Sequence, residues 1–572
     1  MELSWEPIKG LTLSGKAGYK YYNWTDQWFQ STFVFDKSKT ISPNKLSVSS
    51  GDNSLLTLQS LLRYTKSIDK HNFTLLAGYS QESYKEDATS AFRDNFPNNL
   101  LYELNAGAGS NMQNSGSGSE WALRSYFGRL NYDFNGKYLF EANARYDGTS
   151  RFPTSGRWGL FPSVSAGWRI SEESFVKDNL TWIDNLKLRA SWGKLGNQNI
   201  GTYPYQNVLS TGQNYTFGGA LASGIALTTL ANANVTWETT AVTDLGFDLS
   251  ILKDKLSLTF DYFDKTTSDI LYKKSVSNVL GLGVNEYNAG ELNNKGIEII
   301  LNYHTSIGKV NIGVAPNFSY VKNKVTKLAD GQQKDIGAGL FVGQSMYPIY
   351  GYVADGIFKD AADVASYPTQ PIAGQPGVIR YKDISGPDGV PDGKVDATYD
   401  RTQIGNTIPK YYYGATITAD YKGFDLSILL QGLGGYEKQM GSYMAFAFYN
   451  SGQIQRWQAD GAWTEANPNP NAIYPKLSSL NMGSENAQTS TFWNRNASFL
   501  RLKNLQIGYT IPKSIIHKLG ISNLRIFYSG QNLFTYNHFY KGWDPEMYQA
   551  TGDNPSFYPI TAVHTFGLNV KL

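Results

Sequence analysis

The sequence contains no cysteine among its 572 residues, which excludes a disulfide framework and thiolate metal sites. It also lacks any continuous apolar stretch long enough to cross a membrane as a helix. Charged residues make up only 17%, and a net charge of +3 without basic clusters lacks the footprint of a nucleic-acid-binding protein. We therefore expect no nucleic-acid partner, and any membrane crossing must use strands.

Aromatic residues and glycine are abundant instead. The chain is 14% aromatic and has 56 glycines, yet its mean hydropathy is −0.37. A soluble globular domain carries about 25% charged residues. A transmembrane β-barrel combines an apolar outer band and aromatic girdles with a polar interior. The composition therefore favours a barrel.

Apolar and polar residues alternate along most of the chain, as in strands with one apolar face. The pattern is clearest in Leu245–Ile251 and resumes in Leu256–Tyr262 after a short connection, which predicts an antiparallel hairpin. Asn135-Gly136 and Lys422-Gly423 are further hairpin turns, because both central residues of such a turn need positive φ. Lipid-facing positions should be apolar, and Leu256, Leu258 and Phe260, or Leu505, Ile507 and Tyr509, satisfy that.

The pattern predicts about 17 strands, near residues 2–8, 11–23, 53–66, 72–83, 120–134, 137–147, 158–171, 185–195, 236–252, 255–267, 294–305, 310–323, 409–421, 423–434, 496–511, 521–534 and 562–572. Their connections alternate between short and mostly long, and the long ones are 24–52, 84–119, 148–157, 196–235, 268–293, 324–408, 435–495 and 535–561. Short periplasmic turns opposite long extracellular loops are typical of a transmembrane barrel.

Strand parity predicts that the barrel is incomplete. Single-chain bacterial barrels have even strand numbers, and 17 is odd. Residues 1–8 also lack the basic and apolar regions of a signal peptide. We interpret residues 1–572 as one incomplete barrel domain without a plug, with 324–408 as its longest extracellular loop. In a barrel of the 22-stranded transporter class, five strands would precede Met1.

Several longer phrases, in order along the chain, resemble the SusC/RagA family of TonB-linked outer-membrane transporters. They are Gly159-Leu-Phe-Pro-Ser-Val-Ser-Ala-Gly-Trp168-Arg-Ile-Ser-Glu-Glu-Ser-Phe175, Leu186-Lys-Leu-Arg-Ala-Ser-Trp-Gly-Lys-Leu-Gly-Asn197, Trp237-Glu-Thr, Leu245-Gly-Phe-Asp248, Asn294-Lys-Gly-Ile-Glu298, Tyr421-Lys-Gly-Phe-Asp425, Leu500-Arg-Leu-Lys-Asn-Leu505, Gln531-Asn-Leu-Phe534 and Asp544-Pro-Glu546. The last strand, Phe566-Gly-Leu568-Asn-Val570-Lys-Leu572, resembles the signal read by the barrel-assembly machinery, although many such proteins end in Phe.

The resemblance implies an outer-membrane importer of oligosaccharides or oligopeptides, surrounded by lipid and covered by a SusD-like lipoprotein. It also implies energy supplied by TonB-ExbB-ExbD through a plug and TonB box on the N-terminal side of these residues, and dimerisation of two barrels. Substrate identity is not readable from the sequence. The family implies a bacterium of the Bacteroidota type.

The predicted loop 324–408 contains closely spaced carboxylates, of which Asp388, Asp392 and Asp396 form a candidate calcium loop. Calcium requires six to eight oxygen ligands. Against the EF-hand pattern, Val390 replaces an oxygen ligand and Tyr399 stands where a bidentate Glu belongs. We interpret the segment as a glycine-rich acidic turn that needs no metal, and we predict weak or no calcium binding and no other cofactor.

Aromatic residues in the predicted loops are candidates for substrate binding, because rings with polar handles suit sugars and peptide side chains alike. The candidates are Tyr350, Trp457, Trp463, Tyr540 and Trp543. For each residue taken singly, packing within the loops is the favoured interpretation.

Other outer-membrane barrels, such as a passive porin or a barrel enzyme, are the alternative functions. No catalytic residues are predicted and no enzyme is expected, because the five histidines are scattered and no activated nucleophile is visible. A secreted all-β adhesin would require polar residues where Leu256, Leu258 and Phe260 stand.

Overall fold

The computed structural model describes residues 1–36, 39–370, 374–449, 452–478, 485–540, 542–547 and 560–572. Seventeen strands belong to one sheet: β1 (Glu2–Ile8), β2 (Leu11–Gln30), β5 (Lys45–Ile68), β6 (His71–Asp94), β7 (Gln113–Phe134), β8 (Tyr138–Thr149), β9 (Trp158–Arg169), β10 (Ile183–Asn197), β16 (Glu238–Ile251), β17 (Leu256–Ser268), β21 (Glu291–Ile307), β22 (Val310–Lys327), β29 (Tyr411–Tyr421), β30 (Phe424–Gly434), β33 (Phe499–Thr510), β34 (Asn523–Asn537) and β35 (Val563–Lys571). All seventeen predicted strands are confirmed.

Four neighbouring strands run at least seven residues further than the alternation predicted. β2 has 20 residues, β5 and β6 each have 24, and β7 has 22. Their extensions contain runs of polar residues and glycine, such as 49–54 and 113–120, which interrupt the alternation, and side-chain hydrogen bonds join β5, β6 and β7 across the ladder. Ser50 and Thr89 are 3.3 Å apart, and Ser90 and Ser115 are 2.7 Å apart. Hydrogen bonding to neighbouring strands therefore maintains these strands beyond the residues in which apolar and polar side chains alternate.

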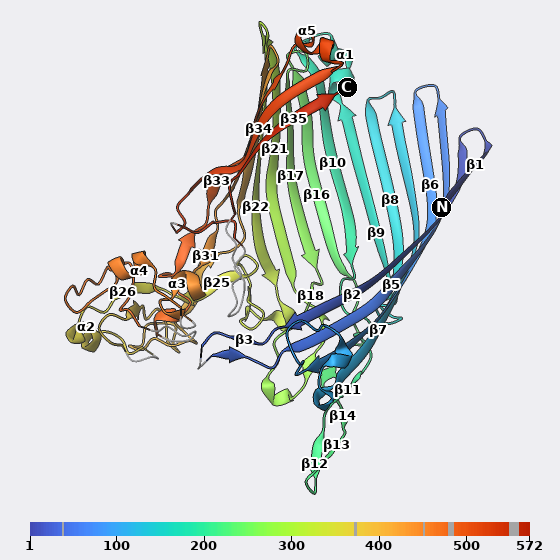
Figure 1. Cartoon of the computed structure of the whole chain (residues 1–572). Helices are drawn as coiled ribbons and strands as arrows, with labels where there is room; N and C mark the ends of the chain where they lie inside the picture. The colour runs from blue at the N-terminus through green and yellow to red at the C-terminus, as the bar shows by residue number, and fades with distance from the viewer. Residues whose placement is uncertain (37–38, 371–373, 450–451, 479–484, 541, 548–559) are drawn as a thin grey trace. The chain divides into compact units, whose positions relative to one another are not determined.

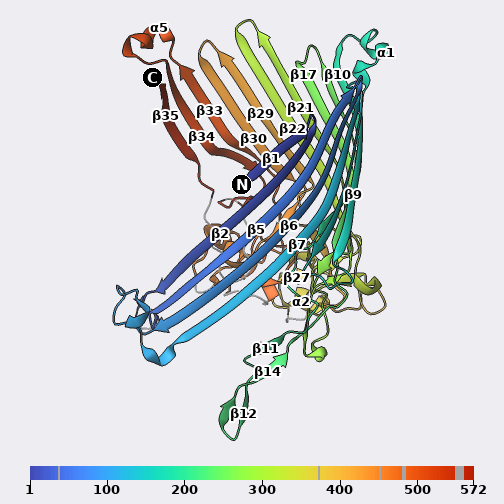
Figure 2. The same cartoon turned by 90° about the vertical axis from the view of Figure 1, so that its right-hand side faces the viewer.

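The chain divides into two compact units. Unit 1 is Met1–Arg169, Arg189–Thr243 and Thr266–Gly290, and unit 2 is Ile170–Leu188, Asp244–Lys265 and Glu291–Leu572. In unit 1, β1, β2, β5, β6, β7, β8 and β9 each pair antiparallel with the next, and Figure 2 shows β2, β5, β6 and β7 side by side. The predicted turn between β7 and β8 is confirmed, with φ of 57° at Asn135 and 67° at Gly136.

In unit 2, the strands β21, β22, β29, β30, β33, β34 and β35 pair antiparallel in that order. The register places apolar residues of six strands in one row, namely Ile312, Ala419, Leu426, Ile507, Tyr528 and Phe566. Successive residues of a strand point to opposite faces. An adjacent row on the other face contains Gly313, Thr418, Ser427, Gln506, Ser529 and Thr565. The sheet of unit 2 thus has an apolar and a polar face.

The connections contain short elements of their own. In unit 1 these are β3 (Phe33–Val34), β4 (Thr40–Ile41), β11 (Leu209–Thr211), β12 (Tyr215–Phe217), β13 (Ala220–Ala222), β14 (Ile225–Leu227), β15 (Thr229–Leu230), β18 (Leu271–Tyr272), β19 (Gly283–Val284) and β20 (Tyr287–Asn288). In unit 2 they are α1 (Ser174–Lys177), β23 (Lys334–Asp335), β24 (Leu340–Phe341), β25 (Pro348–Tyr352), β26 (Ala354–Ile357), α2 (Ala361–Ser366), β27 (Ile379–Tyr381), β28 (Arg401–Asn406), β31 (Glu437–Gln439), α3 (Ser442–Ala445), α4 (Arg456–Gly461), β32 (Asn494–Asn496) and α5 (Lys513–Ile516).

The long connections of unit 2 share one hydrophobic core. In Figure 1, α2, α3 and α4 gather at one end of the unit's strands, and α5 lies at the opposite end. The core includes Tyr352, Phe446, Tyr474 and Trp493, with Tyr474 and Trp493 fully buried. These connections were predicted only as loops, and residues 548–559 of the predicted connection 535–561 lie outside the described residues. Among the described helices, none has the length and apolar character to cross a membrane.

Candidate functional site

The loop core of unit 2 brings together three of the five predicted aromatic candidates. Trp457, Tyr540 and Trp543 are half-buried and pack against this core. The rings of Trp457 and Tyr540 are 4.9 Å apart. The guanidinium of Arg495 lies 4.8 Å from the Tyr540 ring centre, a cation–π distance. Residues from two connections, 435–498 and 538–562, therefore form one aromatic group.

The other two aromatic candidates lie elsewhere. Trp463 is only 3% exposed, so its ring serves packing in this structure. Tyr350 stacks on Phe341 with ring centres 4.6 Å apart, and the Arg401 guanidinium lies 5.6 Å from its ring centre. Whether any of the five aromatic residues contacts substrate stays a prediction.

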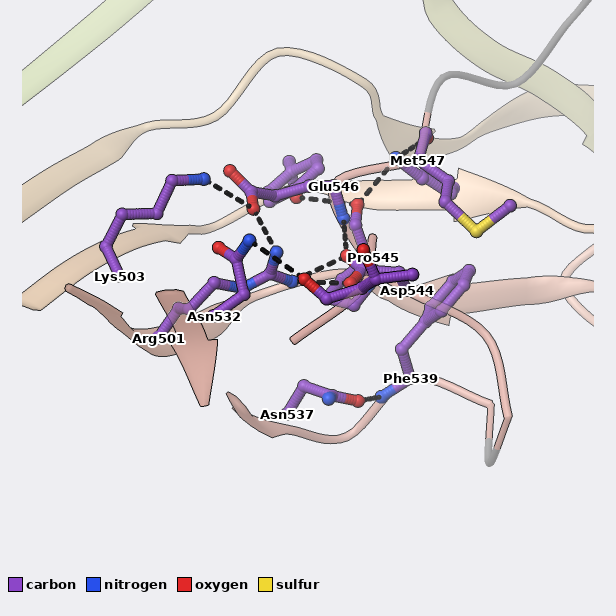
Figure 3. Close-up of polar contacts among 12 residues, drawn as sticks. Arg501, Lys503, Asn532, Asn537, Phe539, Asp544, Pro545, Glu546 and Met547 are labelled. Carbon is purple, nitrogen blue, oxygen red and sulfur yellow. Dashed lines mark hydrogen bonds and ion pairs between the residues drawn. The ribbon is translucent and has the colours of Figure 1, made fainter. Parts of the chain in front are cut away.

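A buried ionic cluster lies beside the aromatic group, and Figure 3 shows Arg501 and Lys503 pointing toward Asp544 and Glu546. Arg501 Nη2 donates to both carboxylate oxygens of Asp544, at 2.6 and 2.7 Å. Arg501 Nη1 is 2.6 Å from a Glu546 carboxylate oxygen, and Lys503 Nζ is 3.4 Å from the same oxygen. The Arg501 side chain is only 1% exposed. A buried charge of this kind is tolerated only when it is paired.

Lys438 of β31, in the connection 435–498, also contacts this cluster. Its ammonium group donates to the backbone carbonyls of Pro545 and Met547, at 2.6 and 2.5 Å. Burial lowers the pKa of Lys438, and the carboxylates of Asp544 and Glu546 act in the opposite direction. Tyr436 donates to the Pro545 carbonyl at 3.4 Å. The segment 542–547, which we name the strap, is thus held by groups from two separate parts of the chain.

Arg501 and Asp544 lie in phrases that carry the family resemblance, but no role was predicted for either residue. Arg501 and Lys503 lie two residues apart in β33, and a register shift between Leu502 and Asn504 brings both cations to Glu546. Two cations two residues apart and two carboxylates in Asp544-Pro-Glu546 were the available signal. The partnership itself was not predictable, because 43 residues separate Arg501 from Asp544.

The candidate calcium loop uses its carboxylates for backbone hydrogen bonds. Asp396 Oδ1 accepts from the amides of Thr398 and Tyr399, and Asp392 Oδ1 accepts from the amide of Lys394. Asp388 is exposed. Among the described residues, no group of three or more His, Asp or Glu side chains is placed to hold a metal. The geometry is that of an acidic turn, and calcium binding stays untested.

The family comparison gives a match over nearly the whole chain. The family described as TonB dependent receptor-like, beta-barrel matches residues 2–533. The chain belongs to this family. A member from Formosa agariphila, TonB-dependent receptor P3, is 30% identical over 593 aligned residues, covering 97% of this chain and 57% of that protein. TonB-dependent receptor SusC from Bacteroides thetaiotaomicron is 29% identical, covering 78% of this chain and 44% of SusC.

Solved structures agree with this membership of the TonB-dependent receptor family. A structure of the RagAB peptide transporter superimposes with a TM-score of 0.81 at 26% identity, covering 99% of this chain and 60% of that one. The predicted resemblance to the SusC/RagA family is therefore confirmed. This TonB-dependent receptor chain spans somewhat more than half the length of the P3 and RagAB chains it matches.

Proposed function

We propose that this chain forms the barrel wall of an outer-membrane importer that takes up oligosaccharides or oligopeptides and is energised through TonB-ExbB-ExbD. The observation that carries the proposal is the division of the unit 2 sheet into an apolar row over six strands and an adjacent polar row on the other face. Ile507 and Phe566 of the apolar row are 46% and 81% exposed. Lipid would cover such a face and water the other.

The partner and the domain organisation are parts of the same proposal. A SusD-like surface lipoprotein is the proposed partner, because the relatives include SusC and RagAB. Residues 1–572 are proposed as one incomplete barrel domain, with 17 of 22 strands and with 324–408 as its longest extracellular loop. The barrels are proposed to dimerise. The matched relatives are named as receptors and transporters, which supports a transport function over an enzymatic one.

Uptake by the bacterium that encodes this chain tests the proposal. Labelled oligosaccharides and oligopeptides would be offered to wild-type cells, to cells without this gene and to cells without TonB. We expect at least one of the two classes to enter wild-type cells and neither deletion strain. Fractionation should find the chain in the outer membrane, and its recovery in a soluble fraction would contradict the proposal.

A passive porin is the alternative that the same experiment separates. A porin would require this gene for uptake but would continue to admit substrate without TonB. Uptake that requires this gene and persists without TonB would support a porin and contradict the importer.

A further inference from the structure

The strap makes contacts of two kinds with the rest of unit 2. Trp543, at its start, packs on the aromatic loop core. Asp544 and Glu546 pair with Arg501 and Lys503 of the wall strand β33. The strap therefore connects the loop core to the wall.

The strap is also shaped for its ionic contacts. The Asp544 carboxylate accepts from the Glu546 amide at 2.8 Å, and the Met547 amide donates to the Asp544 carbonyl at 3.1 Å. Pro545, between the two acids, has a restricted φ. This turn presents both carboxylates to one guanidinium, so that Nη2 contacts Asp544 and Nη1 contacts Glu546, and such charge-assisted contacts are stronger than hydrogen bonds between neutral groups.

We propose that Arg501 is a positioning residue that keeps the strap closed on β33 throughout the working cycle and so holds Trp543 and Tyr540 at the loop core. Opening the strap would carry Asp544 and Glu546 away from β33 and leave the buried Arg501 guanidinium without these two partners, which is unfavourable. The aromatic group would then be a rigid surface. The role of the closed strap in the working cycle rests on the proposed import function. The closure of the strap by Arg501 does not depend on that function.

The absence of cysteine makes the strap easy to probe. Met547→Cys places a single thiol on the strap, and its labelling by a membrane-impermeant maleimide in intact cells reports how often the strap opens. Arg501→Met removes the charge while keeping a long side chain. We expect it to raise the labelling rate by about tenfold or more, because the partner carboxylates lose their buried cation.

The matched control is Arg525→Met, which removes another ion-paired arginine of unit 2, on β34. In the Met547→Cys background it should change the labelling rate by no more than about twofold, because the opening of a segment depends on the contacts that the segment itself makes. If Arg501→Met is not recovered in a folded form, Asp544→Asn with Glu546→Gln removes the same pairs from the strap side. Unchanged labelling in folded Arg501→Met, or in this double variant, would overturn the proposal.

A covalent bridge between the strap and β33 tests whether the strap stays closed during substrate uptake. Lys503→Cys and Glu546→Cys, joined by a short bifunctional reagent, would tie the strap to β33 while Arg501 remains. We expect bridged cells to retain uptake. We also expect Arg501→Met to reduce uptake, and bridging to restore it in that variant. Loss of uptake on bridging would overturn the proposal. If cells with the unaltered chain show no uptake, while Arg501→Met still raises the labelling of Met547→Cys, the importer function is contradicted and the closure of the strap by Arg501 is not.

Discussion

Arg525 on β34 and Asp425 on β30 form an ion pair across the strand that separates them. Arg525 Nε and Nη2 lie 2.9 and 2.5 Å from the two carboxylate oxygens, and β33 runs between the two strands. A Cβ on Gly508 of β33 would lie 2.4 Å from atoms of both side chains. The ion pair therefore depends on a residue without a side chain.

Gly508→Ala should destabilise the folded chain by about 1–3 kcal/mol, because the added methyl group must displace the ion pair or the strand. The measurement is urea unfolding in lipid vesicles. Gly15→Ala on β2 is the control, since its Cβ would meet no atom within 4 Å. That change should be neutral or stabilising by roughly 0.5–1 kcal/mol, and equal effects at the two positions would refute the explanation.

Ile428→Arg should strongly impair assembly in the outer membrane, whereas Ser427→Arg should not. Ile428 pairs with Ile417 and Leu505 on the apolar face, and Ser427 pairs with Thr418 and Gln506 on the opposite face. An arginine facing lipid near the bilayer midplane costs about 2–4 kcal/mol. Heat-modified gel mobility would report the folded fraction. Greater damage from Ser427→Arg would show that the two faces have been assigned the wrong way round.

Asp400→Asn should destabilise the acidic turn, although we predict no calcium requirement. Asp400 is fully buried and accepts from the amides of Ile384, Ser385 and Asp396. An asparagine would turn an NH2 group toward at least one of these donors, at a cost of about 1–3 kcal/mol. Urea unfolding would measure the change, with exposed Asp388→Asn as the neutral control.

Calcium itself is checked by calorimetry and by unfolding with a chelator. The carboxylates of the turn already accept amide hydrogen bonds, so chelation should leave stability unchanged. A sub-micromolar dissociation constant for calcium would overturn the interpretation of this loop as a metal-free turn.

Stability of the loop core should fall between pH 10 and 12. Burial raises the pKa of Tyr474 from its ordinary value of 10 to about 12, so the folded state holds its proton more tightly than the unfolded state. The stabilisation is complete below the unfolded pKa and is lost as the pH rises through the folded one, up to about 2–3 kcal/mol. Phenolate absorbance alongside unfolding would follow the transition.

Tyr474→Phe is the control for this pH dependence. The variant should lose much of the fall in stability above pH 10, because the buried phenol is gone. It should be less stable near neutral pH by about 1–3 kcal/mol, since the Ala447 amide that donates to the Tyr474 hydroxyl at 2.8 Å would lose its acceptor. An unchanged high-pH transition in the variant would exclude Tyr474 as its cause.

Local patterns in the sequence predicted every strand of the large sheet and its hairpin turns, although not the full length of β2, β5, β6 and β7. Alternation between residues i and i+2 follows from strand geometry, and the positive φ values at Asn135-Gly136 and Lys422-Gly423 follow from turn chemistry. The ordered phrases likewise identified the family. Each of these signals is local or cumulative along the chain, so it can be read without knowing which distant residues meet.

Contacts between residues that are distant in the sequence became visible only in the folded chain. Trp463 and Trp457 are both tryptophans of one connection, yet the first is buried and the second half-buried. Arg501 meets Asp544 because β33 and the strap are brought together by the pairing of β33 with β34 and by the packing of Trp543 on the loop core. Such contacts depend on register and burial summed over several segments, which no local pattern encodes.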